Sequence, residues 1–224
     1  MLIALNWGAS LHAQKPGSYL INPDQDTISD NQRLYNGKIW RNQYYLVKED
    51  QFLYSKEFLP GSISMRGRSF PGITLKYDLY KDEILTPSPD GVMQINKEMI
   101  DSFSLIFNQR KFDFIKLQED TLKKSVTFFN VVYKGKTALL IRYSKKIDKL
   151  AVEGRYDQFY QISRVFLLKG NKLLQVTGKN DLLTFMAEAK TQIKEFMKTN
   201  KIRVSEKDPE SFIPVVKYYD SLNR

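Results

Sequence analysis

The stretch "ITLKYDLY", residues 73–80, decides the fold class. Apolar residues at every second position alternate with Thr74, Lys76 and Asp78. A β-strand sends successive side chains to opposite faces, so this alternation predicts a strand with one buried and one hydrated face. The same period recurs in residues 103–107 and, with Arg164 as the exception, in residues 160–168.

Tight turns separate these predicted strands. Asn36-Gly37 stands between "RLY" and "KIW" and is a strong hairpin signal, because both residues accept positive φ angles. Further glycine turns are expected at Gly67, Gly135 and Gly170. Strands joined in series by tight turns pair antiparallel. The run "VTFFNVV", residues 126–132, is apolar on both faces and predicts a central strand.

The pattern changes to helical spacing after residue 178. An apolar stripe runs through residues 180–201, and a second helix fits residues 208–222. The second helix begins either after Asp208 or at Ser211, which places Pro214 in its first turn. We therefore predict an α+β fold, mainly an antiparallel β-meander, curled or two-layered, with two C-terminal amphipathic helices packed on it.

The first residues have the pattern of a secretory signal. "LIALNWGASLHAQKPG", residues 2–17, combines a short apolar run with small residues at which a signal peptidase cuts. No Lys or Arg precedes the run, and a buried N-terminal element is the alternative. We predict four regions: a signal peptide (1–14), an exposed N-terminal arm (15–32), an antiparallel β domain (33–177) and a helical region packed on the same core (178–224).

The residue inventory restricts the available chemistry. The chain has no cysteine, and its single histidine, His12, falls in the predicted signal peptide. The mature chain would then lack the groups that build Ser-His-Asp triads, thiolate nucleophiles and the usual zinc sites. The acidic pairs Asp82/Glu83 and Glu119/Asp120 are interpreted as solvated turn charges. We therefore expect no catalytic residue, no cofactor and no metal site.

Two residue clusters are candidate binding sites. The formal net charge of +10 suits anionic partners or simply maintains solubility. The densest basic run forms a candidate anion-binding patch of Lys134, Lys136, Arg142, Lys145, Lys146 and Lys149, although lysines also protect sheet edges. A candidate aromatic cleft, or alternatively core filling, consists of Tyr44, Tyr45, Phe52, Tyr54 and Phe58.

Several phrases carry a resemblance to known sequences. They are "YNGKIW", "DQFLYSKEFLPGSI", "LKYDLYKDEIL", "INKEMIDSF", "KNDLL", "IKEFMKTNKI" and "YYDSL". In this order they resemble a group of uncharacterised exported proteins of Bacteroidetes bacteria, over residues 33–222. The resemblance implies export to the periplasm or the outer-membrane region and implies no catalytic residue.

These observations favour a non-catalytic exported cell-envelope protein that binds a partner protein or an amphiphilic ligand. A periplasmic lipid carrier with a curled half-barrel is one alternative. A carboxylate-only carbohydrate-active enzyme, with two acids in a cleft, is the other. Because export makes nucleic acid the least expected anionic partner, we expect no nucleic-acid partner. We expect no transmembrane span, because the apolar run is shorter than the roughly 20 residues that a span needs.

Overall fold

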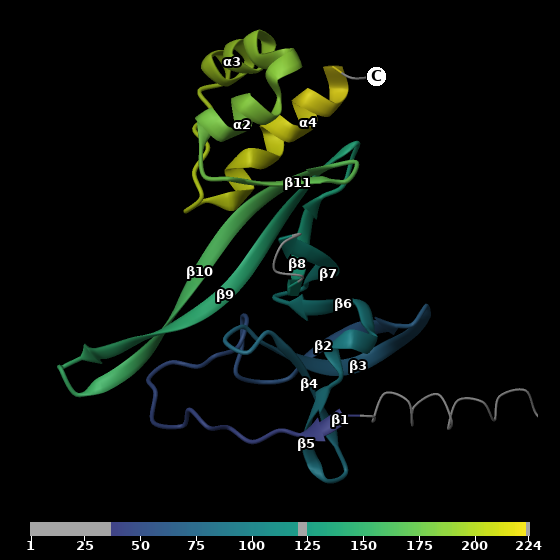
Figure 1. The fold of residues 1–224 in the computed structure, drawn as a ribbon, viewed down its shortest axis with the longest axis vertical. Coiled ribbons are helices and arrows are strands. Elements are labelled where there is room, and N and C mark those ends of the chain that lie inside the picture. The colour runs from purple at the N-terminus through teal and green to yellow at the C-terminus, as the bar shows by residue number, and fades with distance from the viewer. Residues whose placement is uncertain (1–36, 121–124, 223–224) are drawn as a thin grey trace, which may run out of the picture.

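The computed structural model describes residues 37–120 and 125–222, and it confirms the predicted fold class. Most of the described chain forms one eleven-stranded antiparallel sheet, in the order β1-β5-β4-β3-β2-β6-β7-β8-β9-β10-β11. The C-terminal helices pack on one end of this sheet, and β1, β4 and β5 lie at the opposite end (Figure 1). The predicted signal peptide, with His12, and the predicted N-terminal arm lie outside the described residues.

The strands occupy most of the chain between residues 37 and 176. Their bounds are β1 Gly37–Ile39, β2 Leu59–Met65, β3 Arg68–Asp78, β4 Glu83–Ser88, β5 Gly91–Ile95, β6 Ile100–Phe107, β7 Arg110–Asp120, β8 Ser125–Tyr133, β9 Thr137–Val152, β10 Tyr156–Lys169 and β11 Lys172–Val176.

The connection between β5 and β6 curls the sheet. Strands β2 to β5 form a meander, and the short 3-10 helix η2 (Lys97–Met99) then returns the chain so that β6 pairs with the free side of β2. From β6 to β11 every strand pairs with the next one along the chain. The central-strand prediction for "VTFFNVV" is confirmed, since β8 lies between β7 and β9 and buries Phe128 and Phe129 in two different clusters.

Aromatic rings fill the inside of the curl. Phe103 and Phe114 stack at a centroid distance of 4.5 Å. Tyr77 makes edge contacts with both rings and with Phe128. These side chains are at most 3% exposed and belong to one large cluster, which we call the first core. The interior of the curled sheet is therefore packed with side chains.

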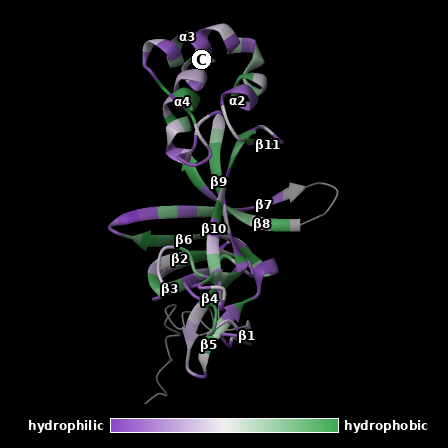
Figure 2. Cartoon of the chain, turned by 90° about the vertical axis from the view of Figure 1, so that its left-hand side faces the viewer, coloured by the Kyte–Doolittle hydropathy of each residue, from purple (hydrophilic) through white to green (hydrophobic). Residues whose placement is uncertain are grey.

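A second core lies between the sheet and the helices. It joins Leu139, Val165 and Leu167 of the sheet to the helices α2 (Lys179–Phe185), α3 (Lys190–Thr199) and α4 (Ile213–Leu222). The apolar stripe of residues 180–201 forms two helices, α2 and α3, joined through the 3-10 turn η3 (Ala187–Ala189). Pro214 lies in the first turn of α4, which follows the 3-10 turn η4 (Pro209–Phe212). Figure 2 shows this helical layer at one end of the molecule, with hydrophobic strand segments beneath it.

The turn predictions were partly correct. Gly67 and Gly170 have positive φ angles of 75° and 58° and stand in the two-residue turns between β2 and β3 and between β10 and β11. The prediction that Gly37 lies in a hairpin turn was wrong. Gly37 begins β1 and pairs with Ile95 of β5. A glycine is needed there because a Cβ atom would lie 2.0 Å from the carbonyl oxygen of Gln94.

The stretch "ITLKYDLY", residues 73–80, has the predicted pattern of buried side chains except at one position. Leu75, Tyr77 and Leu79 are buried, as the alternation requires. Asp78, expected on the hydrated face, is fully buried. Within the described ranges, no helix is both long enough and apolar enough to cross a membrane.

Candidate functional site

A two-stranded hairpin projects from the sheet. Strand β9 pairs with β8 only as far as Ile141, but it continues to pair with β10 up to the pair Tyr156↔Val152. We call residues 144–162 the distal hairpin. In Figure 1 it extends past the rest of the sheet to a tip at the lower left.

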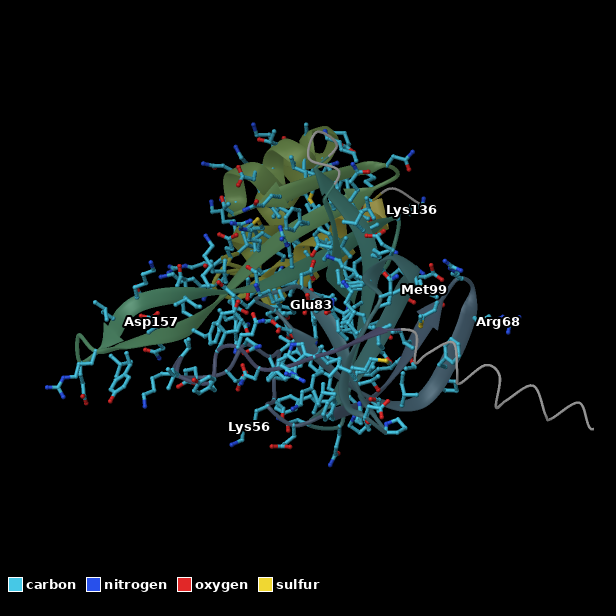
Figure 3. The ribbon with its side chains drawn as sticks, turned by 60° about the horizontal axis from the view of Figure 1, so that its bottom comes forward. Lys56, Arg68, Glu83, Met99, Lys136 and Asp157 are labelled. Carbon is cyan, nitrogen blue, oxygen red and sulfur yellow. The ribbon has the colours of Figure 1, made fainter. Side chains whose placement is uncertain are left out.

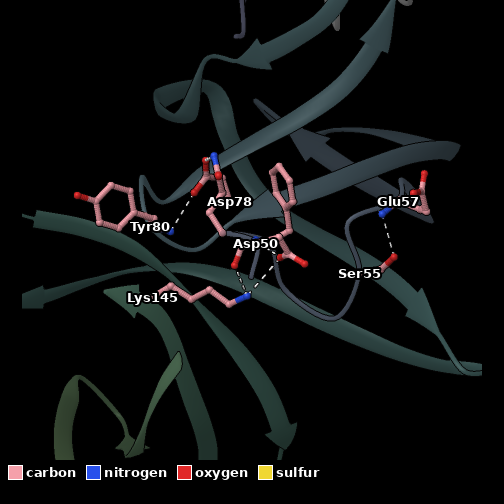
Figure 4. A network of polar contacts seen from close by, with 8 residues as sticks. Asp50, Ser55, Glu57, Asp78, Tyr80 and Lys145 are labelled. Carbon is pink, nitrogen blue, oxygen red and sulfur yellow. Dashed lines mark hydrogen bonds and ion pairs between the residues drawn. The ribbon is translucent and has the colours of Figure 1, made fainter. Parts of the chain in front are cut away.

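A segment from the N-terminal side of the sheet runs beside β10 of this hairpin and forms a parallel bridge with it between Lys48 and Gln158. We call residues 43–50 the strap. The Lys48 N–H donates to the carbonyl of Asp157 at 2.8 Å, and the Phe159 N–H donates to the carbonyl of Lys48 at 3.1 Å. Lys145 Nζ donates to the carbonyl oxygen of Asp50 at 2.6 Å and lies 3.3 Å from its Oδ1 atom (Figure 4). These contacts hold the strap and the hairpin together as one unit.

Aromatic contacts join the strap to the distal hairpin and to the β3–β4 turn. The ring of Tyr44 makes edge contacts with Tyr80 and Phe159, at centroid distances of 4.9 and 5.9 Å. Phe159 is buried, and Tyr80 also contacts it. The side of the strap that faces the hairpin is therefore partly buried by aromatic contacts.

Exposed apolar side chains concentrate on this unit. Eight large hydrophobic residues are exposed in the part of the chain that the structure describes, and five belong to the strap or the distal hairpin. They are Tyr45 (76% exposed), Leu46 (72%), Leu150 (58%), Tyr160 (45%) and Tyr156 (43%). We call these five side chains together the hairpin–strap surface; they share one structural unit, and Tyr160 lies on the face of the hairpin opposite Phe159.

The structure separates the six residues of the candidate anion-binding patch. Lys134 and Lys136 lie at the turn between β8 and β9, and Lys146 lies ten residues beyond Lys136 along β9, a span of roughly 33 Å at 3.3 Å per residue. In Figure 3, Lys136 and the hairpin residue Asp157 lie on opposite sides of the molecule. Only part of the predicted patch therefore reaches the distal hairpin.

The other patch residues differ in environment. Arg142 is half-buried, and burial lowers the pKa of its guanidinium, although Asp82 opposes this effect. Lys145 is bound to the strap. Lys146 and Lys149 are exposed on the distal hairpin.

The structure also separates the five residues of the candidate aromatic cleft. Tyr44 and Tyr45 belong to the strap. Phe52 is buried, with its ring centroid 5.9 Å from that of Trp40. Tyr54 packs on Phe107 and Phe112 beside the first core, and burial raises the pKa of its hydroxyl. Lys76 covers the ring of Phe58. Phe52 and Tyr54 act as core filling, and the five rings do not meet in one cleft.

A pocket that we did not predict lies at the base of the strap. We call it the polar pocket; its volume is about 270 Å³. Its lining includes Trp40, Arg41, Tyr44, Lys81, Glu83 and Gln94. These residues come from the strap and the chain just before it, the β3–β4 turn, and strands β4 and β5.

Two carboxyl groups face each other across neighbouring strands of this pocket. Asp78 and Glu83 are cross-strand partners. Asp78 Oδ1 accepts the N–H groups of Tyr80 and Lys81, and its Oδ2 accepts Gln51 Nε2 at 3.0 Å. Burial raises the pKa of Asp78, and these hydrogen bonds oppose that effect. Burial, followed by the neighbouring Asp78, also raises the pKa of Glu83.

Asp82 points away from this pocket. Its carboxylate accepts the hydroxyls of Tyr77 at 2.6 Å and of Thr127 at 2.7 Å, and it forms an ion pair with Lys97. The interpretation of Asp82 as a solvated turn charge was wrong, because the β3–β4 turn packs against β8. The side chains of the second acidic pair, Glu119/Asp120, lie outside the described residues.

One sequence feature could have indicated the distal hairpin. Residues 137–169 contain a single glycine, Gly154, and its φ of 63° makes it part of the turn at the hairpin tip. Two strand-like runs on either side of one tight turn predict a long hairpin. No comparable local pattern marks the polar pocket, whose lining comes from separate segments.

Within residues 37–120 and 125–222, no group of three or more His, Cys, Asp or Glu side chains could hold a metal ion. Comparisons with protein-family models, with curated proteins and with solved structures found no match.

Proposed function

We propose that the protein is a non-catalytic, exported cell-envelope protein that binds a partner protein through the hairpin–strap surface. The observation that carries this proposal is the concentration of exposed apolar side chains there, five of the eight in the described chain. A concentration of exposed apolar side chains on one part of a folded protein marks an interaction site more often than scattered single residues do. Three of the five are tyrosines, a residue type enriched in protein interfaces.

The surface is also held in one conformation before binding. Hydrogen bonds from Lys48 and Lys145 and the packing of Tyr44 fix the strap on the hairpin. A preorganised surface loses less conformational freedom on binding, so more of the apolar contact remains as affinity. Lys146 and Lys149 lie beside the apolar residues and favour a partner with carboxylates around its own apolar patch.

The geometry gives less support to the two alternatives. A lipid carrier needs an open apolar interior, whereas Phe103, Phe114 and Phe128 fill the curl of the sheet. A two-carboxylate enzyme needs both acids available to substrate. Three hydrogen bonds already occupy Asp78, which is fully buried.

Export is part of the proposal and has its own test. It rests on the apolar run and the small residues of "LIALNWGASLHAQKPG", residues 2–17, and on the resemblance described above. Mass spectrometry of the protein purified from the envelope of its own host should give a mature chain that starts near Gln14 or Lys15. A chain that retains Met1 would contradict export by this signal.

Site-specific photo-cross-linking tests the binding surface. A photoreactive phenylalanine analogue replaces Tyr45 or Tyr160 in one set of variants, and the exposed Lys194 on α3 in the control variant. Irradiation of host cells should give the same discrete heavier adduct from positions 45 and 160 and none from position 194. Adding Leu46→Ser and Leu150→Ser should reduce that adduct strongly.

Three results would overturn the proposal. The first is equal cross-linking from all three positions, and the second is no adduct from any of them. The third is an adduct of twice the chain mass, which would make a second copy of this chain the occupant. Far-UV circular dichroism of each variant checks that the sheet is intact.

A further inference from the structure

The polar pocket is electrically balanced. Among its lining side chains, Arg41 and Lys81 carry positive charge, and Asp78 and Glu83 are the acids. A site for an anion or a cation has an excess of the opposite charge, because an isolated charge loses its hydration on binding. A balanced lining favours a neutral ligand that is itself polar.

The remaining lining residues define that ligand further. Gln43, Gln51 and Gln94 supply side-chain amides, each of which both donates and accepts hydrogen bonds. A hydroxyl group has the same dual capacity, so a ligand with several hydroxyls matches several amides at once. Trp40 and Tyr44 add aromatic surface, on which the C–H face of a sugar ring can pack.

Glu83 lines the pocket without a direct hydrogen bond from the described part of the protein, although Lys81 and Lys97 act on its charge from a distance. Glu83 is half-buried, and its carboxyl group takes part in no hydrogen bond or ion pair within the described residues. Its neighbour Asp78, by contrast, accepts three hydrogen bonds. Because Glu83 lines the pocket, a ligand hydroxyl can replace water as the donor to its carboxylate.

The walls of the pocket are fixed by the fold. The Trp40 N–H donates to the carbonyl of Val92 at 2.8 Å. This hydrogen bond holds the chain just before the strap against β5. The ammonium of Lys81 lies 5.5 Å from the ring centroid of Tyr44 and 5.4 Å from that of Tyr80. Gln94 projects from β5 and Glu83 begins β4. Sites built on such rigid elements keep their geometry.

We infer that the polar pocket binds a neutral polyhydroxylated ligand of the size of one sugar unit, with Glu83 as a hydrogen-bond acceptor and Trp40 as an aromatic contact. This site is separate from the hairpin–strap surface, although Tyr44 lies beside both. The inference does not depend on the proposed partner protein, and it requires no covalent chemistry.

Tryptophan fluorescence provides a direct readout. The chain has two tryptophans, Trp7 and Trp40, so Trp7→Phe leaves Trp40 as the only one. This variant of the full chain is titrated with D-glucose, D-galactose, D-mannose and N-acetyl-D-glucosamine, each alone. Inorganic phosphate and putrescine serve as charged probes of similar or smaller size. A sugar unit has about 12 heavy atoms, which corresponds to a Kd on the order of 1 mM.

The expected result is a saturable fluorescence change with at least one of the four sugars and none with phosphate or putrescine. Glu83→Ala should weaken that binding about tenfold, the loss expected for one buried hydrogen bond. The matched control Glu195→Gln removes a carboxylate from the exposed face of α3 and should leave the Kd unchanged. Saturation-transfer NMR, which does not depend on Trp40, should give the same ranking of sugars.

Three outcomes would overturn the inference. One is the absence of sugar binding in both measurements up to about 50 mM, roughly fifty times the expected Kd. The second is binding of phosphate or putrescine in place of the sugars. The third is sugar binding that Glu83→Ala leaves unchanged. Cross-linking at position 160 reports the partner protein separately, so failure of one proposal is distinguishable from failure of the other.

Discussion

Replacing Asp82 tests how the β3–β4 turn is fixed on the sheet. Asp82→Ala leaves the hydroxyls of Tyr77 and Thr127 without their acceptor, and both residues are at most 3% exposed. Each unsatisfied buried hydroxyl costs about 1–3 kcal/mol. Asp82 also has a φ of 58°, a conformation that Asp and Asn tolerate and that costs Ala about 1–2 kcal/mol. The partly exposed ion pair with Lys97 adds less than about 1 kcal/mol.

These contributions amount to a loss of at least about 3 kcal/mol in the free energy of unfolding. Urea denaturation followed by far-UV circular dichroism measures it. With a slope of about 2–3 kcal/mol per M, the midpoint should fall by at least about 1 M. Asp82→Asn keeps an acceptor and tolerates the positive φ, so its loss should be about half as large. The exposed turn residue Asp90 is the control, since Asp90→Ala should change stability by less than about 0.5 kcal/mol. A loss below about 1 kcal/mol for Asp82→Ala, or equal losses for the Ala and Asn variants, would refute this reasoning.

Three further perturbations test other parts of the structure. Gly135→Ala places a Cβ atom 2.1 Å from Asp220 Oδ2, so it should displace the carboxylate that accepts the N–H of Thr137 and lower the thermal midpoint by several degrees in calorimetry. The hydrogen bond from Lys169 is the main cause that lowers the pKa of Glu188 from 4.5 to about 2. Its stabilising contribution is therefore complete above pH about 4.5 and is lost as the pH falls towards 2. Glu188→Gln should be less stable than the wild type by up to about 1 kcal/mol at pH 7, and the difference should disappear near pH 2 in urea titrations. Lys145→Met removes one of the links between strap and distal hairpin, so amide hydrogen exchange of residues 43–50, measured by mass spectrometry, should accelerate about tenfold while the midpoint of the helical region stays unchanged.

The fold class could be predicted because its determinants are local. Alternation in residues 73–80 and the turn glycines Gly67 and Gly170 specify strands and antiparallel hairpins within a few positions of the chain. The split of the first predicted helix was missed because the apolar stripe continues through Met186, where the backbone leaves the helical conformation with φ −102° and ψ 39°. Both α2 and α3 bury the apolar residues of that stripe. The stripe therefore predicts which side chains are buried, but not where the helix is interrupted.

The candidate site could not be predicted in the same way, because long-range contacts create it. Asp78 is buried through a hydrogen bond from Gln51, 27 positions away in the sequence. Lys145 binds Asp50 across 95 positions. The basic run of residues 134–149 is compact in sequence, but most of it lies on one extended sixteen-residue strand, so its two ends are far apart. A charge count along the chain therefore overestimated the patch.

The same long-range contacts explain why the hairpin–strap surface can remain apolar. A two-stranded hairpin is marginally stable alone in water. The distal hairpin is nevertheless ordered, because Phe159 is buried under Tyr44 and the strap adds hydrogen bonds at Lys48. Stabilisation thus comes from the covered face of the hairpin. Tyr160, the neighbour of Phe159, lies on the opposite face and contributes little to folding because it is 45% exposed. Its apolar surface is consequently available for a partner, whose binding would neither break a core contact nor need to order the strap.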